Sequence, residues 1–550
     1  MKAAGGQDRD ATCASDEKER WSAQGRVSNV MFQFDEPMFF RHLTEFMQPY
    51  CVIGAFLVSA AVGVGAQTTN QPGRSLALND CVQIALEHNL DVQIERLDPE
   101  IARYNLSLAY AGYDPNLSIG GQHDFSLSPS GYSTAINQSF PGATSDDNSF
   151  NAGISGLLPM GLNYNLSGNV SETYGSRPDA FGVARPFQNA GGRAQITLTQ
   201  PLLKNFWIDQ TRMNIWVSRK SIKTSELNLR LQIMNTVSSV EQAYYNLIAA
   251  LETVKVNQMA VELAERTLME NKKKVEVGTM APLDEKQAES QVYLNRANLL
   301  SARRALSAQQ NLLKKLLSDN YSNWQEVDLQ PAENLAAPAQ LFNLQDSWQK
   351  GLAMRPELIS AKNEVEKQDI VLRYNRNQLF PELDLIGTYG HAAGGSADTY
   401  ASAFDQMKQG SSPFYTYGAR LTMPLTRIGP RYTYKASKAQ KQRLVLQLKQ
   451  LEQSIMVQID DAVRLAQTSF ERVEATKQGR IYAEAALDAE QKKYESGKST
   501  SFFVLQFQQT LTNARSQEIQ ALADYNNSLS QLALAEGSTF DRSHLSVLVK

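Results

Sequence analysis

The chain of 550 residues lacks the features that mark several common protein classes. Its 54 Lys and Arg are balanced by 57 Asp and Glu, so the basic excess of a nucleic-acid-binding protein is missing. Only one apolar stretch reaches about 15 residues and none reaches about 20, which excludes a helical membrane protein with several spans. An apolar share of 42% is too high for low-complexity disorder. Composition alone would therefore suggest soluble domains of about 150 residues each.

Residues arranged for catalysis or metal binding are also missing. No HExxH, GxSxG or P-loop motif occurs in the sequence, so we expect no enzyme activity and no cofactor. No metal site is expected either, because the five histidines are scattered without the spacing of ligands. They stand at His42, His88, His123, His391 and His544.

Residues 1–66 are predicted to be an N-terminal extension followed by a secretory signal peptide. An apolar run extends from Cys51 to Val64, and the small residue Ala66 suits cleavage directly after it. The run is shorter than the roughly 20 residues that a spanning helix needs, so a single membrane anchor is the less favoured alternative. Residues 1–37 are polar and do not resemble a leader, which makes Met31 or Met38 a candidate start. Cleavage would leave Cys81 as the one cysteine, excluding an intrachain disulfide.

The sequence contains an internal repeat in two copies. The segment 78–91 recurs as 344–357, an offset of 266 positions, and Pro115 recurs as Pro381 at the same offset. Farther along the offset falls to 223 and then 219, so the first copy holds 43 more residues between its two prolines. The pairs that define these later offsets are Pro201 with Pro424 and Gly278 with Gly497.

Two structural repeats are therefore predicted, over residues 67–330 and 331–538, with a C-terminal tail over 539–550. Each repeat is expected to contain a helix, strands, a very long helix, a turn and another long helix. In the first repeat the expected helices are 78–114, 204–277 and 283–330, with strands within 116–200; in the second they are 346–380, 431–496 and 498–536, with strands within 382–423.

The expected helices are unusually long. No Gly or Pro occurs between Lys204 and Val277, and a helix over this stretch would extend roughly 110 Å. Globular helices average about 11 to 12 residues, so helices of this length must lie side by side in a bundle or coiled coil. Helices alone would also fit a passive filament or tether.

The strands argue against a filament. From Leu162 to Ser171 apolar residues alternate with Asn and Ser, which is typical of a transmembrane β-barrel with a polar lumen. A half-exposed soluble sheet is the alternative, and the Gly/Ser/Asn-rich loops at 128–148, 174–192 and 392–413 favour the barrel. The first repeat has enough alternation for four strands, so two long bent strands and an added hairpin both stay open.

The order and spacing of these motifs over residues 76–538 resemble the TolC-like outer membrane efflux proteins, also called outer membrane factors. The resemblance implies a mixed α and β fold, in which long helices form an all-α tunnel through the periplasm and a homotrimer shares one transmembrane β-barrel in the outer membrane. Each protomer would give four strands to this barrel, and an unclosed edge in lipid would be costly. The motifs are Arg355-Pro356-Glu357-Leu358, Pro115 and Pro381, Pro201 and Pro424, and Val277-Gly278-Thr279 with Leu283-Asp284.

The same resemblance implies a passive exit duct of a tripartite efflux or type I secretion system. Its partners would be a periplasmic adaptor (membrane fusion) protein, an inner-membrane transporter of RND or ABC type, and outer-membrane lipid. Adaptors would dock at the helix tips, at Gly278, Thr279, Gly497 and Lys498. A structural periplasmic coiled-coil tether without a pore is the alternative.

A gate is implied at the same tips. Tyr494 and Asp284 match positions at which a tyrosine-to-aspartate hydrogen bond would tie the two helical hairpins together; a surface tyrosine and a helix-capping aspartate are the alternative. Ser499 stands where an arginine latch would be.

Phe503 and Gln506 stand at the positions of two aspartates that would line the aperture, so a polar acidic ring is in doubt. An apolar constriction by Phe502 or Phe503 is a substitute, because hydrophobic constrictions can gate by dewetting.

Overall fold

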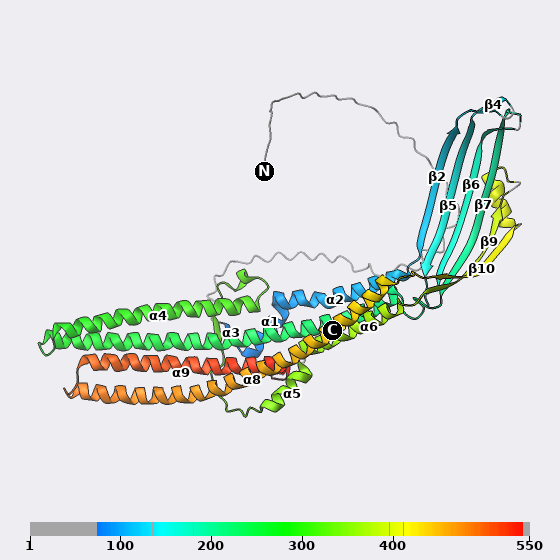
Figure 1. The fold of residues 1–550 in the computed structure, drawn as a ribbon. Coiled ribbons are helices and arrows are strands. Elements are labelled where there is room, and N and C mark those ends of the chain that lie inside the picture. The colour runs from blue at the N-terminus through cyan, green and yellow to red at the C-terminus, as the bar shows by residue number, and fades with distance from the viewer. Residues whose placement is uncertain (1–73, 135–136, 180, 395–396, 411, 543–550) are drawn as a thin grey trace, which may run out of the picture. The chain divides into compact units, whose positions relative to one another are not determined.

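The computed structural model describes residues 74–134, 137–179, 181–394, 397–410 and 412–542, so the predicted signal peptide and its cleavage site lie outside the described residues. These ranges form long helical hairpins and a six-stranded sheet (Figure 1). Among their helices, none combines the length and the apolar character that crossing a membrane requires.

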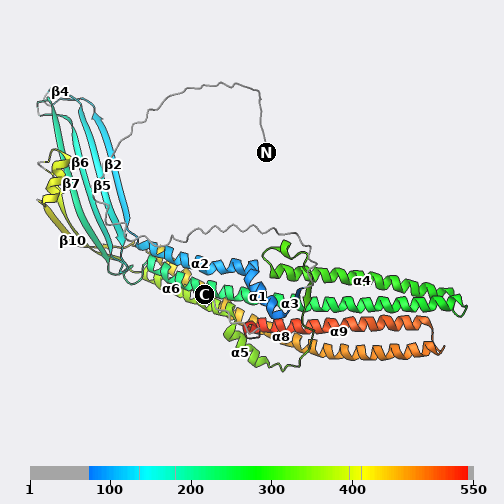
Figure 2. The same ribbon diagram turned by 180° about the vertical axis from the view of Figure 1, so that it is seen from behind.

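Each repeat builds two shorter helices and two long ones, and the long ones pair as hairpins α3–α4 and α8–α9 (Figure 2). In the first repeat they are α1 (Leu78–His88), α2 (Leu90–Tyr110), α3 (Gln210–Glu276) and α4 (Pro282–Leu317). In the second they are α5 (Leu344–Met354), α6 (Pro356–Asn377), α8 (Ile428–Glu495) and α9 (Ser501–Glu536).

Two expected helices are broken at equivalent positions of the repeat. The helix expected over 78–114 is interrupted at Asn89, whose extended backbone lets its side chain accept hydrogen bonds from the next turn and cap α2. The helix expected over 346–380 is interrupted at Arg355, because the residue before Pro356 is disfavoured in the helical conformation. Pro356 then occupies the first turn of α6.

Other expected boundaries shift for local reasons. The helix expected from 204 begins at Gln210, because Asp209 accepts a 2.8 Å hydrogen bond from the Arg212 amide and caps α3. The helix expected to reach 330 ends at Leu317, where the Ser318 hydroxyl bonds the Lys314 carbonyl. Beyond it the chain forms a short strand that pairs in parallel with the first described strand, as β8 (Leu329–Pro331) with β1 (Arg74–Leu76).

The last two expected long helices, 431–496 and 498–536, appear as α8 and α9 with starts displaced by three residues each. Gly479 lies inside α8 without interrupting it. Part of the predicted C-terminal tail is also helical, as α10 (Thr539–Arg542).

Each repeat has its own hydrophobic core, and each core buries one tyrosine of a long helix, α3 in the first and α9 in the second. Tyr244 is buried in the first core, together with Cys81, and its hydroxyl donates a 3.0 Å hydrogen bond to the Leu76 carbonyl. Tyr525 is buried in the second core and donates a 2.6 Å bond to the Pro338 carbonyl. Both hydroxyls thus find carbonyl partners as their rings are buried, and each fixes a connecting segment onto a long helix.

The sheet is antiparallel throughout, in the order β10-β9-β7-β6-β5-β2. The first repeat contributes four of its strands, which answers the open question in favour of an added hairpin and corrects the expectation of four strands in each protomer. The strands are β2 (Asn116–Ser128), β5 (Ala143–Leu157), β6 (Asn163–Pro178), β7 (Ala184–Pro201), β9 (Glu382–Ala393) and β10 (Pro413–Thr422). A small hairpin of β3 (Gly131–Ser133) and β4 (Gln138–Phe140) lies in the β2–β5 loop.

The register places apolar residues on one face of the sheet and polar residues on the other. Neighbouring residues along a strand point to opposite faces, so adjacent cross-strand rows belong to different faces. One row that crosses all six strands is apolar: Leu117, Ile154, Leu166, Ile196, Tyr389 and Tyr415. The row next to it is polar: Asn116, Ser155, Asn165, Thr197, Thr388 and Thr416.

A helix not expected from the sequence, α7 (Tyr400–Gln409), lies in the 392–413 segment that was predicted to be a loop. Its first turn is capped by reciprocal hydrogen bonds between Thr399 and Ser402, and it ends at Gly410 with a φ of 67°. Ala403 is buried against Ala190 of β7, so the helix lies on the sheet.

Candidate functional site

The tips of the two long hairpins are closed by the same turn. Gly278 and Gly497 have φ values of 73° and 75°, a conformation that favours glycine. The amide after each glycine reaches back five residues, from Thr279 to the Lys274 carbonyl at 2.9 Å and from Lys498 to the Lys493 carbonyl at 2.8 Å. These bonds complete a Schellman motif in both repeats, so the predicted tip residues form two matching turns.

The Tyr494 side chain joins the two hairpins. Its hydroxyl donates a 3.0 Å hydrogen bond to Oδ1 of Asn271, a fully buried residue of α3. The Lys274 ammonium lies 4.0 Å from the centre of the Tyr494 ring, close enough for a cation–π contact. The end of α8 is therefore tied to the end of α3 by one hydrogen bond and one charged contact.

Asp284 forms a second link, with a different partner from the one predicted. Its Oδ1 accepts a 3.1 Å hydrogen bond from the hydroxyl of Ser501, the first residue of α9. Ser501 is 1% exposed, so this bond is shielded from water. The predicted Tyr494–Asp284 bond is thus replaced by two parallel links, Tyr494 to Asn271 and Ser501 to Asp284.

Ser499 belongs to a link inside its own hairpin. Its hydroxyl donates to one oxygen of the Glu490 carboxylate, and the Lys493 ammonium lies 3.1 Å from the other oxygen. The Ser499 bond, followed by the bond and charge of Lys493, lowers the pKa of Glu490 below its ordinary value of 4.5. Ser499 therefore fixes the turn after α8 through a bond within its own hairpin.

Phe502, Phe503 and Gln506 lie on the surface of α9. Phe502 and Phe503 are 51% and 47% exposed, with ring centres 5.5 Å apart, and Gln506 is also exposed. The residues between them, including Val504, turn inward onto an apolar cluster with Leu487. The start of α9 therefore carries two adjacent, exposed aromatic side chains, as the predicted apolar constriction would require.

Three further residues at the tips, Asn271, Ser501 and Glu490, were not predicted from the sequence. The repeat could have revealed two of them, because Asn271 and Glu490 stand at the offset of 219 that also relates Gly278 to Gly497. Each accepts a hydrogen bond at its tip, from Tyr494 and from Ser499. Ser501 carries no comparable signal, because its partner Asp284 comes from the other hairpin.

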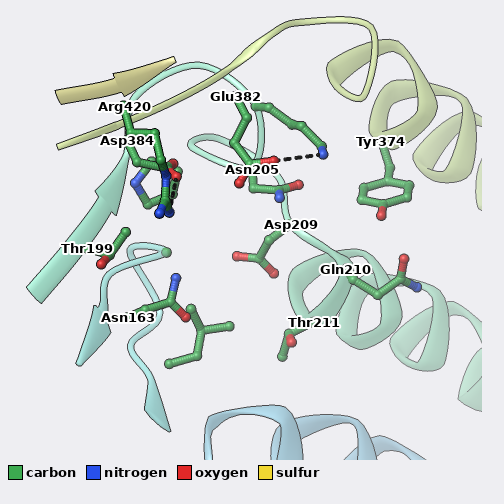
Figure 3. A pocket seen from close by; sticks show the side chains of 14 residues that line it. Asn163, Thr199, Asn205, Asp209, Gln210, Thr211, Tyr374, Glu382, Asp384 and Arg420 are labelled. Atoms are coloured by element: carbon green, nitrogen blue, oxygen red, sulfur yellow. Dashed lines mark hydrogen bonds and ion pairs between the residues drawn. The ribbon is translucent and has the colours of Figure 1, made fainter. Parts of the chain in front are cut away.

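A polar cavity of about 470 Å³ lies where the sheet meets the long helices (Figure 3). Lys204 forms a 3.2 Å ion pair with Glu382 at its wall, and Arg420 forms one of 3.4 Å with Asp384. Asp209, the cap of α3, also faces the cavity. Each of the two cations at the cavity wall is therefore paired with a carboxylate of β9.

No group of three or more His, Cys, Asp or Glu suited to a metal ion occurs within the described residues.

A family model, described as outer membrane efflux protein, matches residues 184–318 and 348–538. The pyoverdine export outer membrane protein of Pseudomonas aeruginosa is 21% identical over 55% of this chain and 61% of its own length. Outer membrane protein TolC of Escherichia coli is 24% identical over 56% and 61%. The chain thus spans about three fifths of the length of these two relatives.

A third relative is covered more fully: the cobalt-zinc-cadmium resistance protein CzcC of Cupriavidus metallidurans is 22% identical over 74% of this chain and 93% of its own length. In the solved structure of the CmeC outer membrane channel of Campylobacter jejuni, 94% of that chain matches 88% of this one with a TM-score of 0.60 at 16% identity. The identity is low, so the structural likeness concerns the fold. With the family match covering more than half of the residues, the chain belongs to the outer membrane efflux protein family, whose place is the outer membrane with helices in the periplasm.

Proposed function

We propose that the protein is the passive outer-membrane exit duct of a tripartite efflux or type I secretion system. The observation that carries the proposal is the two-faced sheet, apolar on one side and lined by Asn, Ser and Thr on the other, continued by long helical hairpins. An apolar face suits lipid, and a polar face suits a water-filled lumen. The runner-up, a tether without a pore, leaves the polar face without a role.

A homotrimer is the assembly that we propose. Within the described residues β2 and β10 each pair along one side only, and an open edge in lipid leaves backbone groups unsatisfied at several kcal/mol each. Because β2 and β10 run in opposite directions, β10 of one copy can pair with β2 of the next and close a barrel.

The helix α2 supports the same assembly. Its exposed apolar residues follow the alternating spacing of four and three that a coiled-coil seam has. This stripe is at least half exposed in a single chain, so a second copy is a fitting cover. It comprises Leu90, Ile94, Leu97, Ile101, Tyr104 and Leu108.

The partners in the periplasm are proposed to be an adaptor protein, docking at Gly278, Thr279, Gly497 and Lys498, and an inner-membrane transporter of RND or ABC type. Relatives of similar identity are named for pyoverdine export and for cobalt-zinc-cadmium resistance. Because the polar row holds neutral side chains, we assign the choice of cargo to the transporter rather than to the duct.

The test is native mass spectrometry of protein purified from outer membranes, followed by reconstitution in planar bilayers. Three copies in one particle and a water-filled pore are expected. A monomer, or a trimer that never conducts even after the tip links are removed, would support the tether instead.

A further inference from the structure

The two repeats differ most in the segment that forms the sheet. Pro201 lies 86 positions after Pro115, whereas Pro424 lies 43 positions after Pro381, half as many. The first repeat accordingly gives four strands to the sheet and the second gives two. The surplus is the hairpin β5–β6, which lies between β2 and β7.

The hairpin is the part of the sheet that has no helix of its own. The strands β2 and β9 follow α2 and α6, and β7 and β10 lead into α3 and α8. At that end of the sheet β5 and β6 are instead joined to each other by the turn 158–162 (Figure 1). Only four of the six strands therefore continue into a helix at this end of the sheet.

The hairpin has the pattern of membrane-spanning strands. β5 and β6 contain 15 and 16 residues, more than the roughly 9 to 11 that a spanning strand needs. Phe150 and Leu166 on the apolar face are 54% and 52% exposed, while Asn151 and Asn165 occupy the polar face. Both strands are paired along most of their length, β5 with β2 and β6 with β7, so the hairpin is an integral part of the sheet.

The turn of the hairpin is fitted to the junction with the helices. The Gln200 side chain donates a 3.3 Å hydrogen bond to the Met160 carbonyl. Gly161 has a φ of 83°, and a side chain there would come within 3.1 Å of the Asn205 carbonyl. Asn163 lines the same junction cavity as Asp209 (Figure 3). The close approach at Gly161 shows that the turn packs against the segment that leads from β7 into α3.

We propose that β5–β6 is a pair of barrel strands added to a plan of two strands in each repeat, so that three copies enclose 18 strands instead of 12. The proposal rests on the trimer proposed above. With strands about 4.8 Å apart and tilted about 40°, 12 strands give a circumference of about 75 Å and 18 give about 113 Å.

The added strands match the barrel to the helices below it. Four helices in each of three copies make a ring of 12, and helices packed about 8 to 10 Å apart give a circumference of about 96 to 120 Å. An 18-stranded barrel fits this ring, whereas a 12-stranded barrel would be narrower. The duct therefore keeps its width through the membrane, and bulky hydrophilic cargo meets its narrowest point at the helix tips.

Cysteine accessibility in intact outer membranes tests the proposal. Asn165 and Leu166 of β6 are replaced by cysteine one at a time, with Thr197 and Ile196 of β7 as matched controls from the same two rows. The probe is a membrane-impermeant maleimide, and the parent protein, whose Cys81 is buried, gives the background. Labelling is expected to be at least tenfold faster for N165C than for L166C, and for T197C than for I196C.

The two failures are distinguishable. If N165C and L166C react alike while T197C and I196C still differ, a barrel exists but the hairpin is not part of its wall, and the proposal is overturned. If T197C and I196C also react alike, the barrel itself and the proposed function fail. A strand count of 18 in an electron cryomicroscopy map of the trimer would support the proposal, and a count of 12 would refute it.

Discussion

The hydroxyl of Tyr494 donates a 3.0 Å hydrogen bond to the buried side-chain oxygen of Asn271, and this bond joins the last turn of α8 to the last turns of α3. Nearby, Ser501 donates to Asp284 and joins α9 to α4. Opening the tips by separating the two hairpins would break both bonds. We therefore propose that these two polar links in each protomer hold the channel closed.

Replacing Tyr494 by phenylalanine removes one link and keeps the ring. A hydrogen bond contributes about 1 kcal/mol, so three protomers that open together would lose about 3 kcal/mol, and the ratio of open to closed channels would rise roughly 100-fold. Release of a small fluorophore from proteoliposomes measures the change. The control is Tyr482→Phe on the same helix, whose side chain is 71% exposed and should leave release unchanged. Release equal to wild type in Tyr494→Phe would refute a latch at this position.

The link between Ser501 and Asp284 can be isolated by a double-mutant cycle with S501A, D284A and the double variant. Each single change breaks the same bond, so the double variant should leak no more than the leakier single variant. Additive effects on the logarithm of the leak rate would mean that the two side chains act independently. The exposed pair Asp488 and Lys492 on α8 provides the control cycle, in which no coupling is expected.

Acid should loosen the turn after α8. Since hydrogen bonds and Lys493 lower the pKa of Glu490 in the folded chain, its contribution is present above the ordinary value of 4.5 and is lost as the pH falls through the lowered pKa. The protection factors of the amides around Gly497, which are corrected for the intrinsic pH dependence of hydrogen exchange, should therefore fall as the pH drops below 4.5. In Glu490→Gln the protection factors should already be low at pH 7 and should change little with acid. A pH response that persists in Glu490→Gln would show that another group causes it.

Glu241 should contribute to stability with the opposite pH dependence from Glu490. This carboxyl of α3 is 3% exposed, and burial raises its pKa despite the Ser530 hydroxyl and the more distant Arg542. The protonated carboxyl then favours folding fully below the unfolded pKa, and this contribution is lost as the pH rises through the raised pKa of the folded chain. Glu241→Gln should raise the melting temperature by roughly 2 to 4 °C at pH 7.5 and should have little effect at pH 4. If Glu241→Gln instead lowered the melting temperature at pH 7.5, the ionised Glu241 side chain would be stabilising the fold, contrary to this prediction.

Local sequence signals predicted much of the fold but not the contacts between distant segments. The repeat offset placed both tips correctly, because Gly278 and Gly497 have a conformation that glycine adopts easily. The breaks at Asn89 and Arg355 were missed, since an apolar period continues across them while a capping side chain or a following proline ends the helix.

The helix tips show the same contrast between local signals, which the sequence reveals, and contacts between distant segments, which it does not. The residues Tyr494 and Asp284 were correctly placed at the tips, but their partners depend on how two hairpins far apart in the sequence lie side by side. The tyrosine bonds Asn271 of α3 instead of Asp284, a detail that no local pattern encodes. The strand count was likewise ambiguous, because alternation cannot distinguish one long bent strand from two strands joined by the turn at Pro159.

The most direct test of closure at the helix tips is a measurement of single-channel conductance. It compares the doubly unlinked variant Y494F/S501A with wild type in the same planar bilayer. Both tip links are absent in this variant, while the sheet and the long helices are unchanged. We expect brief, small openings for wild type and large, sustained openings for the variant, with both proteins trimeric. A variant trimer that conducts no more than wild type would contradict the claim that this protein is a channel held closed at its helix tips.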